Sequence, residues 1–183
     1  MDDAEHLLAR AWRARRDSRL DVAYADLDKA IIMTRTAGED KLLAQALMQQ
    51  AQVERDRSRP NSAVPLYEEA VRLFRRLSDP LALAHAVRHL GDTHCERGDF
   101  DEAMPCYDEA LAIYRAVDDP PALALANALR PMALLHEAQG YANIALPLWR
   151  EAFDLYDAAG IDAGVRECGV HLAALAASHS PSQ

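Results

Sequence analysis

The sequence is poor in cysteine and glycine, and it contains no long apolar run. Its three cysteines, Cys95, Cys106 and Cys168, are odd in number and lack CxxC spacing, so a disulfide framework is not expected. No apolar stretch reaches the roughly 18 residues that a membrane-spanning helix requires. The acidic start, Met1-Asp-Asp-Ala-Glu-His, lacks the basic and apolar segments of a signal peptide. We therefore expect a cytoplasmic protein that makes no contact with a membrane.

An excess of basic residues is also missing, because the formal net charge is -9. General binding to nucleic acid depends on clustered Lys and Arg that neutralise phosphates, so nucleic acid is not an expected partner. The acidity is concentrated in the C-terminal part: residues 1–78 carry 14 Lys+Arg and 13 Asp+Glu, whereas residues 79–183 carry 6 and 16. Five arginines crowd the first predicted helix and form either a solvated face or a site for an acidic partner or an oligomer: Arg10, Arg13, Arg15, Arg16 and Arg19.

The composition that remains is typical of helices. Half of the 183 residues are apolar, only 7 are Gly and 9 are Pro, and Ala and Leu dominate over β-branched residues. This length is sufficient for a sizeable core in one domain and leaves little room for a second. We expect one continuous all-α domain over residues 1–177, followed by a disordered tail at 178–183.

Three segments of the sequence are copies of one another. Residues 63–74 (AVPLYEEAVRLF) match residues 103–114 (AMPCYDEALAIY) at an offset of 40 and residues 145–156 (ALPLWREAFDLY) at a further 42. Residues 23–34 (AYADLDKAIIMT) form a weaker fourth copy. The shared residues recur three or four apart, which is the spacing of one helix face. We interpret the repeat as a packing code, in which small alanines let a neighbouring helix approach and aromatic side chains fill the gaps.

Capping and turn residues divide each repeat into two helices. The predicted N-caps are Asp40, Asp79, Asp119 and Asp162, two of which directly precede a proline. The residues predicted to adopt positive φ at the mid-repeat turns are Ser18, Ser58, Gly98 and Gly140. We predict helices over residues 3–16, 20–37, 41–57, 60–77, 80–97, 100–117, 121–139, 142–159 and 163–177.

The third repeat resembles the tetratricopeptide consensus. It has Leu90-Gly91 in the first helix, Gly98 at the turn, and Ala103 and Tyr107 in the second helix. The period of 40 to 42 is longer than the usual 34 and is shared by HEAT-type repeats, but the Gly98 turn and the Ala/aromatic pattern favour the tetratricopeptide family. The resemblance implies an α-solenoid, a right-handed superhelix of four helix pairs plus a C-terminal capping helix, about nine helices in total. The implied repeats are 3–38, 40–78, 79–118 and 119–160, and the implied capping helix is 162–177.

Prolines recur at one place in the second helix of the later repeats. Pro65, Pro105 and Pro147 fall about one and a half turns into these helices, where proline removes a backbone donor and crowds the carbonyl four residues earlier. We hypothesise a kink or a late helix start at each of them. Pro131 is expected to bend the seventh helix.

Catalytic and metal-binding patterns are weak. His85, His89 and His94, with Asp92 and Cys95, could place two imidazoles on one helix face at i and i+4. No HExxH motif and no Gly-rich phosphate loop accompanies them, and the alternative is a set of groove or core histidines. We expect no enzyme, no bound metal and no cofactor.

The resemblance implies that the first helices of the repeats line a concave binding groove. In the third repeat the positions outside the packing face include His85, Arg88, His89 and Asp92, and the same offsets carry over to the second and fourth repeats. The predicted groove residues are Gln45, Gln49, Gln52, His85, Arg88, His89, Asp92, Asn127, Arg130 and Leu134. Arg88 and Arg130 occupy equivalent positions, where they either clamp a carboxylate or phosphate or are neutralised locally by Asp92 and its neighbours.

The function implied by the resemblance is a non-enzymatic adaptor that binds a protein or peptide. If Arg88 and Arg130 are not neutralised locally, we expect this partner to carry an anionic group as their ligand. One alternative is a regulatory domain that senses a peptide. Another is a self-assembling scaffold, in which Leu8 and Trp12 on the first helix would supply a homodimer contact.

Overall fold

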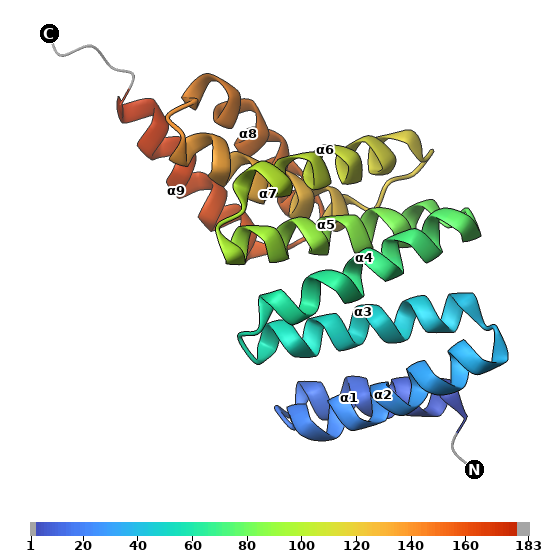
Figure 1. Ribbon diagram of the computed structural model, residues 1–183. Helices are drawn as coiled ribbons and strands as arrows, with labels where there is room; N and C mark the ends of the chain where they lie inside the picture. Colours follow the sequence, from blue (N-terminus) through green and yellow to red (C-terminus); the bar gives the residue numbers. More distant parts are fainter. Residues whose placement is uncertain (1–2, 179–183) are drawn as a thin grey trace, which may run out of the picture. The chain divides into compact units, whose positions relative to one another are not determined.

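The computed structural model describes residues 3–178, which contain nine α-helices and no strand (Figure 1). The chain forms two compact units, residues 1–103 and 104–183. The helices of the first unit are α1 (Ala4–Arg16), α2 (Leu20–Ala37), α3 (Asp40–Asp56), α4 (Pro60–Leu77) and α5 (Pro80–Arg97). The boundary falls within α6 (Phe100–Ala116), and the second unit continues with α7 (Ala122–Ala138), α8 (Ala142–Ala158) and α9 (Asp162–Ser178). The all-α prediction is confirmed, the single-domain limits stay a prediction, and residues 179–183 of the expected tail lie outside the described range.

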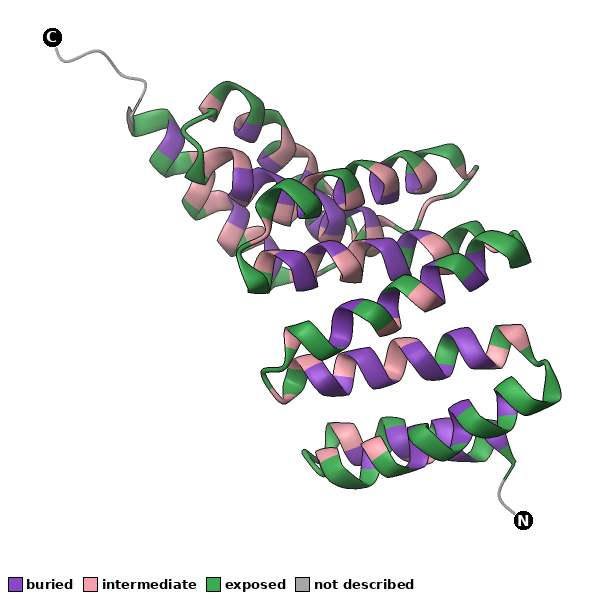
Figure 2. Cartoon of the chain, in the orientation of Figure 1, coloured by how far each residue is buried: buried purple, intermediate pink, exposed green. Residues whose placement is uncertain are grey.

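Helices that follow one another in the chain pack together within each unit. In the first unit α1 contacts α2, α2 contacts α3, α3 contacts α4 and α4 contacts α5, while in the second α7 contacts α8 and α8 contacts α9. Figure 2 shows α3 as buried or half-buried along most of its length, whereas α2 carries more exposed residues. No helix within residues 3–178 has the length and apolar character needed to cross a bilayer.

The predicted packing code is confirmed. All six repeat alanines have no exposed surface: Ala63, Ala70, Ala103, Ala110, Ala145 and Ala152. The aromatic residues between them, Tyr67, Tyr107 and Trp149, are at most 1% exposed. Small and large side chains therefore alternate on the buried face of each second helix, which lets neighbouring helices pack closely.

The mid-repeat turns also form as predicted. Ser18, Ser58, Gly98 and Gly140 have φ values of 59°, 59°, 84° and 80°. The next residue in each turn donates its backbone N–H to the carbonyl five residues earlier, as Asp99 does to His94 at 2.9 Å. This bond is the Schellman arrangement that ends a helix and reverses the chain.

Three of the four predicted N-caps are wrong. Asp79 does cap α5, because its Oδ1 accepts a hydrogen bond from the Ala82 N–H at 3.1 Å. Asp40 and Asp162 are instead the first residues of their helices, where a carboxylate still interacts favourably with the helix dipole. Asp119 lies outside α7, whose N-cap is Pro121. Asp119 and Pro120 each precede a proline, which disfavours helical ψ and delays the helix start.

The repeated prolines lie inside uninterrupted helices. Pro65, Pro105 and Pro147 are internal to α4, α6 and α8, so the predicted late start is wrong. All three side chains are exposed, which leaves the proline ring and the carbonyl that it crowds on the solvent side of the helix. Pro131 is likewise internal to α7. The kink itself stays a prediction.

Candidate functional site

The first unit contains a groove formed mainly by the first helices of its repeats. One cavity of about 210 Å³ is lined by Trp12, Arg15, Met48, Gln49, Gln52, Tyr67, His85 and His89. A second cavity of about 450 Å³ is lined by Gln45, Met48, Gln49, Phe74, Ala82 and His85. Because both cavities use Met48, Gln49 and His85, they adjoin, and we call the combined surface the unit-1 groove. It brings together five of the predicted groove residues: Gln45, Gln49, Gln52, His85 and His89.

Arg88 and Asp92 are not in the lining of either cavity. Arg88 Nη1 donates to Asp92 Oδ2 at 2.8 Å, and the two side chains are only 12% and 20% exposed. Arg88 Nη2 lies 2.8 Å from His89 Nε2. These two residues therefore support an imidazole of the groove from outside its lining.

Arg55, on α3, is a further support of the groove that sequence reasoning missed. Its Nε lies 3.1 Å from both carboxylate oxygens of Glu96, and its Nη1 lies 3.3 Å from His89 Nδ1. Burial opposes its charge, but the hydrogen bonds to Glu96 raise the pKa of Arg55 above its ordinary value. The sequence repeat contains a signal for the Arg55–Glu96 pair, because Arg15 and Asp56 occupy the equivalent positions of the preceding repeat. Arg15 donates to Asp56 at 2.6 Å, and both pairs are separated by 41 residues.

Both imidazoles of the groove are neutral at neutral pH. Burial lowers the pKa of His85 to about 4, and the charges of His89 and Arg88 act in the same direction. Burial also lowers the pKa of His89, against the hydrogen bond to Asp92. His89 Nδ1 lies 3.2 Å from Asp92 Oδ2 and 3.3 Å from Arg55 Nη1, and His89 Nε2 lies 2.8 Å from Arg88 Nη2.

The charges around the unit-1 groove are balanced. Arg15 pairs with Asp56, Arg55 with Glu96, and Arg88 with Asp92. Burial alone would raise the pKa of Asp92, but the His89 hydrogen bond and the Arg88 and Arg55 charges hold it below its usual value. Within residues 3–178, no three His, Cys, Asp or Glu residues gather in a geometry for a metal ion. The groove is therefore suited to hydrogen bonding through amides and neutral imidazoles, and to contact with an apolar group at Met48.

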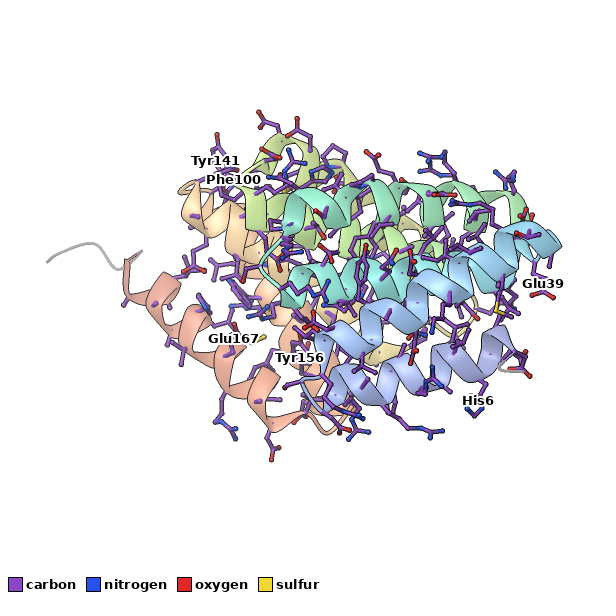
Figure 3. All side chains as sticks on the ribbon, turned by 60° about the horizontal axis from the view of Figure 1, so that its bottom comes forward. His6, Glu39, Phe100, Tyr141, Tyr156 and Glu167 are labelled. Carbon is purple, nitrogen blue, oxygen red and sulfur yellow. The ribbon has the colours of Figure 1, made fainter. Side chains whose placement is uncertain are left out.

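The remaining predicted groove residues belong to the second unit, where each already has a partner or is half-buried. Asn127 Oδ1 accepts a hydrogen bond from the Tyr156 hydroxyl at 2.8 Å. Arg130 donates twice to Glu167, at 2.8 and 2.6 Å, and this bond lowers the pKa of Glu167. Figure 3 shows the labelled side chains of Tyr156 and Glu167 in this unit. Leu134 is half-buried. The arginines proposed as an anion clamp, Arg88 and Arg130, thus each pair with a carboxylate of the chain.

Trp12 is a groove residue that the sequence analysis placed elsewhere. Trp12 is 47% exposed, and the guanidinium of Arg16 lies 4.7 Å from the centroid of its ring. Leu8, the other half of the expected dimer contact, is only 6% exposed, so the Leu8–Trp12 pair does not form an exposed patch. The signal for Trp12 was available, because it lies 40 residues before Gln52 and so occupies the same repeat position.

Comparisons with known proteins agree with this architecture. Residues 81–158 match the family model of the tetratricopeptide repeat. The crystal structure of BtubC from P. vanneervenii is similar with a TM-score of 0.72 at 15% identity, over 98% of this chain and 82% of that one. TPR-like repeats from Podosopora anserina are similar with a TM-score of 0.68 at 14% identity, over 100% of both chains.

A third similar structure is the TPR domain of Arabidopsis FLU, with a TM-score of 0.59 at 16% identity, over 62% of this chain and 96% of that one. No curated protein matches the sequence. At these identities the structures show the fold alone, whereas the family match rests on sequence. Residues 81–158 are therefore tetratricopeptide repeats, and the chain has the helical-repeat fold of tetratricopeptide-repeat proteins.

Proposed function

We propose that this protein is a non-enzymatic adaptor that binds an extended peptide segment of a partner protein in the unit-1 groove. Tetratricopeptide repeats generally serve as protein–protein interaction modules. The observation that carries the proposal is the lining of the two adjoining cavities, which contains Gln45, Gln49 and Gln52 together with Met48. The alternative of a peptide-sensing regulatory domain would use the same groove.

The amides suit a peptide backbone. Each glutamine side chain carries both donors and an acceptor, so a row of them pairs with successive N–H and C=O groups whatever the ligand sequence. Gln52 Oε1 already accepts from the Tyr67 hydroxyl at 3.3 Å, which fixes its orientation. Gln49 borders both cavities and is the residue we assign to the backbone of the ligand.

Met48 supplies the apolar contact. One side of Met48 packs against a buried cluster of Ala51, Ala63 and Tyr67, which fixes its position. Met48 also borders both cavities. A thioether adapts its shape to different side chains, and covering one large apolar side chain contributes about 1.5–3 kcal/mol. Trp12 at the edge of the groove adds an exposed aromatic ring of the kind that dominates many interfaces.

The paired arginines argue for an uncharged anchor in place of the anionic group expected from sequence. An anion at Arg88 or Arg130 would have to displace Asp92 or Glu167 from a guanidinium that it already neutralises. Peptide affinity should therefore depend only weakly on salt, because few ions are released or rearranged on binding.

Selection from a random peptide library tests this proposal. Peptides retained by the wild-type protein are measured by fluorescence anisotropy against Met48→Lys and Gln49→Ala, with Arg72→Ala, an exposed residue of α4 outside both cavities, as the control. We expect Met48→Lys to weaken binding at least about tenfold, which corresponds to 1.4 kcal/mol, and the control to leave it unchanged. Peptides that bind Met48→Lys as tightly as the wild type would contradict the proposal.

A further inference from the structure

Ion pairs connect the second helices of successive repeats at fixed positions. Arg35 on α2 donates to Glu69 on α4 at 2.6 Å. Arg115 on α6 donates to Glu151 on α8 at 2.8 and 2.7 Å. The two glutamates lie 82 residues apart and occupy the same repeat position. In both units this glutamate therefore faces the preceding second helix.

The side of α4 that carries Glu69 also carries a buried leucine. Leu73 follows Glu69 by one helical turn, so the two side chains lie on one side of the helix. Leu73 is only 3% exposed. Since Glu69 bonds to Arg35, this side of α4 is turned toward α2.

In α2 the equivalent positions belong to Lys29 and Met33, each 40 residues before its counterpart. No second helix precedes α2 within the described residues, and Met33 is 40% exposed. The adjacent Ile32 is 60% exposed, at the position that carries Arg72 in α4. Leu7, Lys29, Ile32 and Met33 line a cavity of about 280 Å³, and we call these four residues the α2 end face.

The charge on this face is reversed relative to the rest of the repeats. Where α4 and α8 present a glutamate to the preceding helix, α2 presents Lys29. The nearby carboxylate of Asp26 is already held by Arg10 at 2.6 and 2.5 Å. Lys29 acts on Asp26 only through its charge, which helps to lower the pKa of that carboxylate, whereas Arg10 makes the hydrogen bonds. A helix docked here in the manner of a preceding repeat must present a carboxylate where the internal helices present an arginine.

We propose that the α2 end face docks an amphipathic α-helix of a partner protein, with an Asp or Glu opposite Lys29 and apolar side chains on Ile32 and Met33. A second cavity continues from Met33 to the acidic residues Asp3, Glu5 and Glu39. Glu39 projects outward at the end of α2 (Figure 3). The docked helix therefore carries its acidic residue at the Lys29 end and tolerates basic residues at the other. This surface is separate from the unit-1 groove.

Display selection with a charge swap tests the proposal. A helical-scaffold library with one randomised face is selected on the wild-type protein and counter-selected on Met33→Lys, and a parallel selection uses Lys29→Glu. Met48→Lys is the matched control, with the same substitution placed in the unit-1 groove. We expect wild-type binders to be enriched in Asp and Glu and to lose up to about fivefold in affinity on Lys29→Glu, the upper end of the range of an exposed ion pair. Binders selected on Lys29→Glu should instead be enriched in Arg and Lys.

Three results would overturn the proposal. The selection could yield no helix that discriminates wild type from Met33→Lys, or helices whose charge is unaffected by Lys29→Glu. Sedimentation could also show a self-association that Met33→Lys abolishes, which would assign the face to a second copy of the chain. Circular dichroism on each variant establishes that it is folded, which the exposure of the Lys29 and Met33 side chains favours.

Discussion

Trp149 and His171 stack face to face in the second unit, with ring centroids 4.2 Å apart and planes inclined by 9°. Tyr67 and His89 form the same arrangement in the first unit, at 5.9 Å and 14°. Each member of one pair lies 82 residues from its counterpart, so the two pairs occupy the same repeat positions. The neighbour differs: Arg55 lies beside the first pair, and Glu137, also 82 residues further on, lies beside the second. The two units thus place opposite charges next to the same aromatic contact.

Glu137 is expected to stabilise the second unit through Trp149. Its Oε2 accepts from the indole N–H at 2.8 Å and lies 2.9 Å from His171 Nδ1, while Trp149 has no exposed surface. Glu137→Ala leaves a buried donor without an acceptor and should lower the free energy of unfolding by about 1–3 kcal/mol. Glu137→Gln keeps an acceptor and should cost less. Urea denaturation measures both, and equal losses for Glu137→Ala and the exposed control Asp154→Ala would refute this role.

His85 should make the protein less stable on acidification. Its folded-state pKa is about 4, below the ordinary value near 6.5, so between these values the unfolded chain binds a proton that the folded chain does not. The free energy of unfolding therefore falls as pH is lowered through this window, and His85→Gln should reduce the loss between pH 7 and pH 5 by at most about 1 kcal/mol, because solvent screens the exposed His85 side chain. An NMR titration of the His85 ring with a midpoint near 6.5 would contradict the burial argument.

Replacement of the exposed helix prolines is expected to stabilise the protein. Pro65 and Pro147 interrupt the hydrogen bonding of α4 and α8, and both have exposed side chains. Pro147→Ala should raise the free energy of unfolding by about 1–2 kcal/mol, after the loss of proline's rigidity in the unfolded chain. The converse variant, Ala25→Pro, places a proline at the equivalent exposed position of α2 and should destabilise by a similar amount. A melting temperature that falls for Pro147→Ala and rises for Ala25→Pro would show instead that the prolines relieve strain.

Gly164 should be required for the packing of Tyr156. A Cβ at this position would lie 2.4 Å from Tyr156 Cγ, so Gly164→Ala forces the ring to move and strains its hydrogen bond to Asn127. We expect a loss of about 1–3 kcal/mol. Gly169→Ala on the same helix is the control, because its Cβ would meet Phe153 at an ordinary 4.0 Å and improves helix propensity. Chemical denaturation that ranks the two variants in the reverse order would be inconsistent with this packing.

The fold was largely predictable because its signals are local and repeated. The α4 helix, Pro60–Leu77, coincides with the predicted limits of 60–77, since a proline marks its start and the repeat marks its end. The N-cap prediction at Asp119 was wrong because a second proline, Pro121, follows Pro120 and disfavours helical ψ in it, which delays the start of α7. The glycine and serine residues of the turns could be predicted because few residue types favour a positive φ.

The site was predictable only where one helix face determines it. Gln45, Gln49 and Gln52 share such a face, so they came together as expected. Partners across helices were missed: Arg130 finds Glu167 at a separation of 37 residues, and Arg55 finds Glu96 at 41. Ion pairs between helices depend on side-chain length and local packing, and the hydrophobic periodicity of a single helix predicts neither.

Methyl NMR of the protein labelled at methionine tests the central claim most directly. The chain has five methionines, and one of them, Met48, borders both cavities of the unit-1 groove, whereas Met33 lies on the α2 end face. Titration with a selected extended peptide should shift the Met48 methyl resonance and leave that of Met33 in place. A peptide that binds without shifting Met48, or that shifts Met33 alone, would show that the unit-1 groove is not the peptide-binding site.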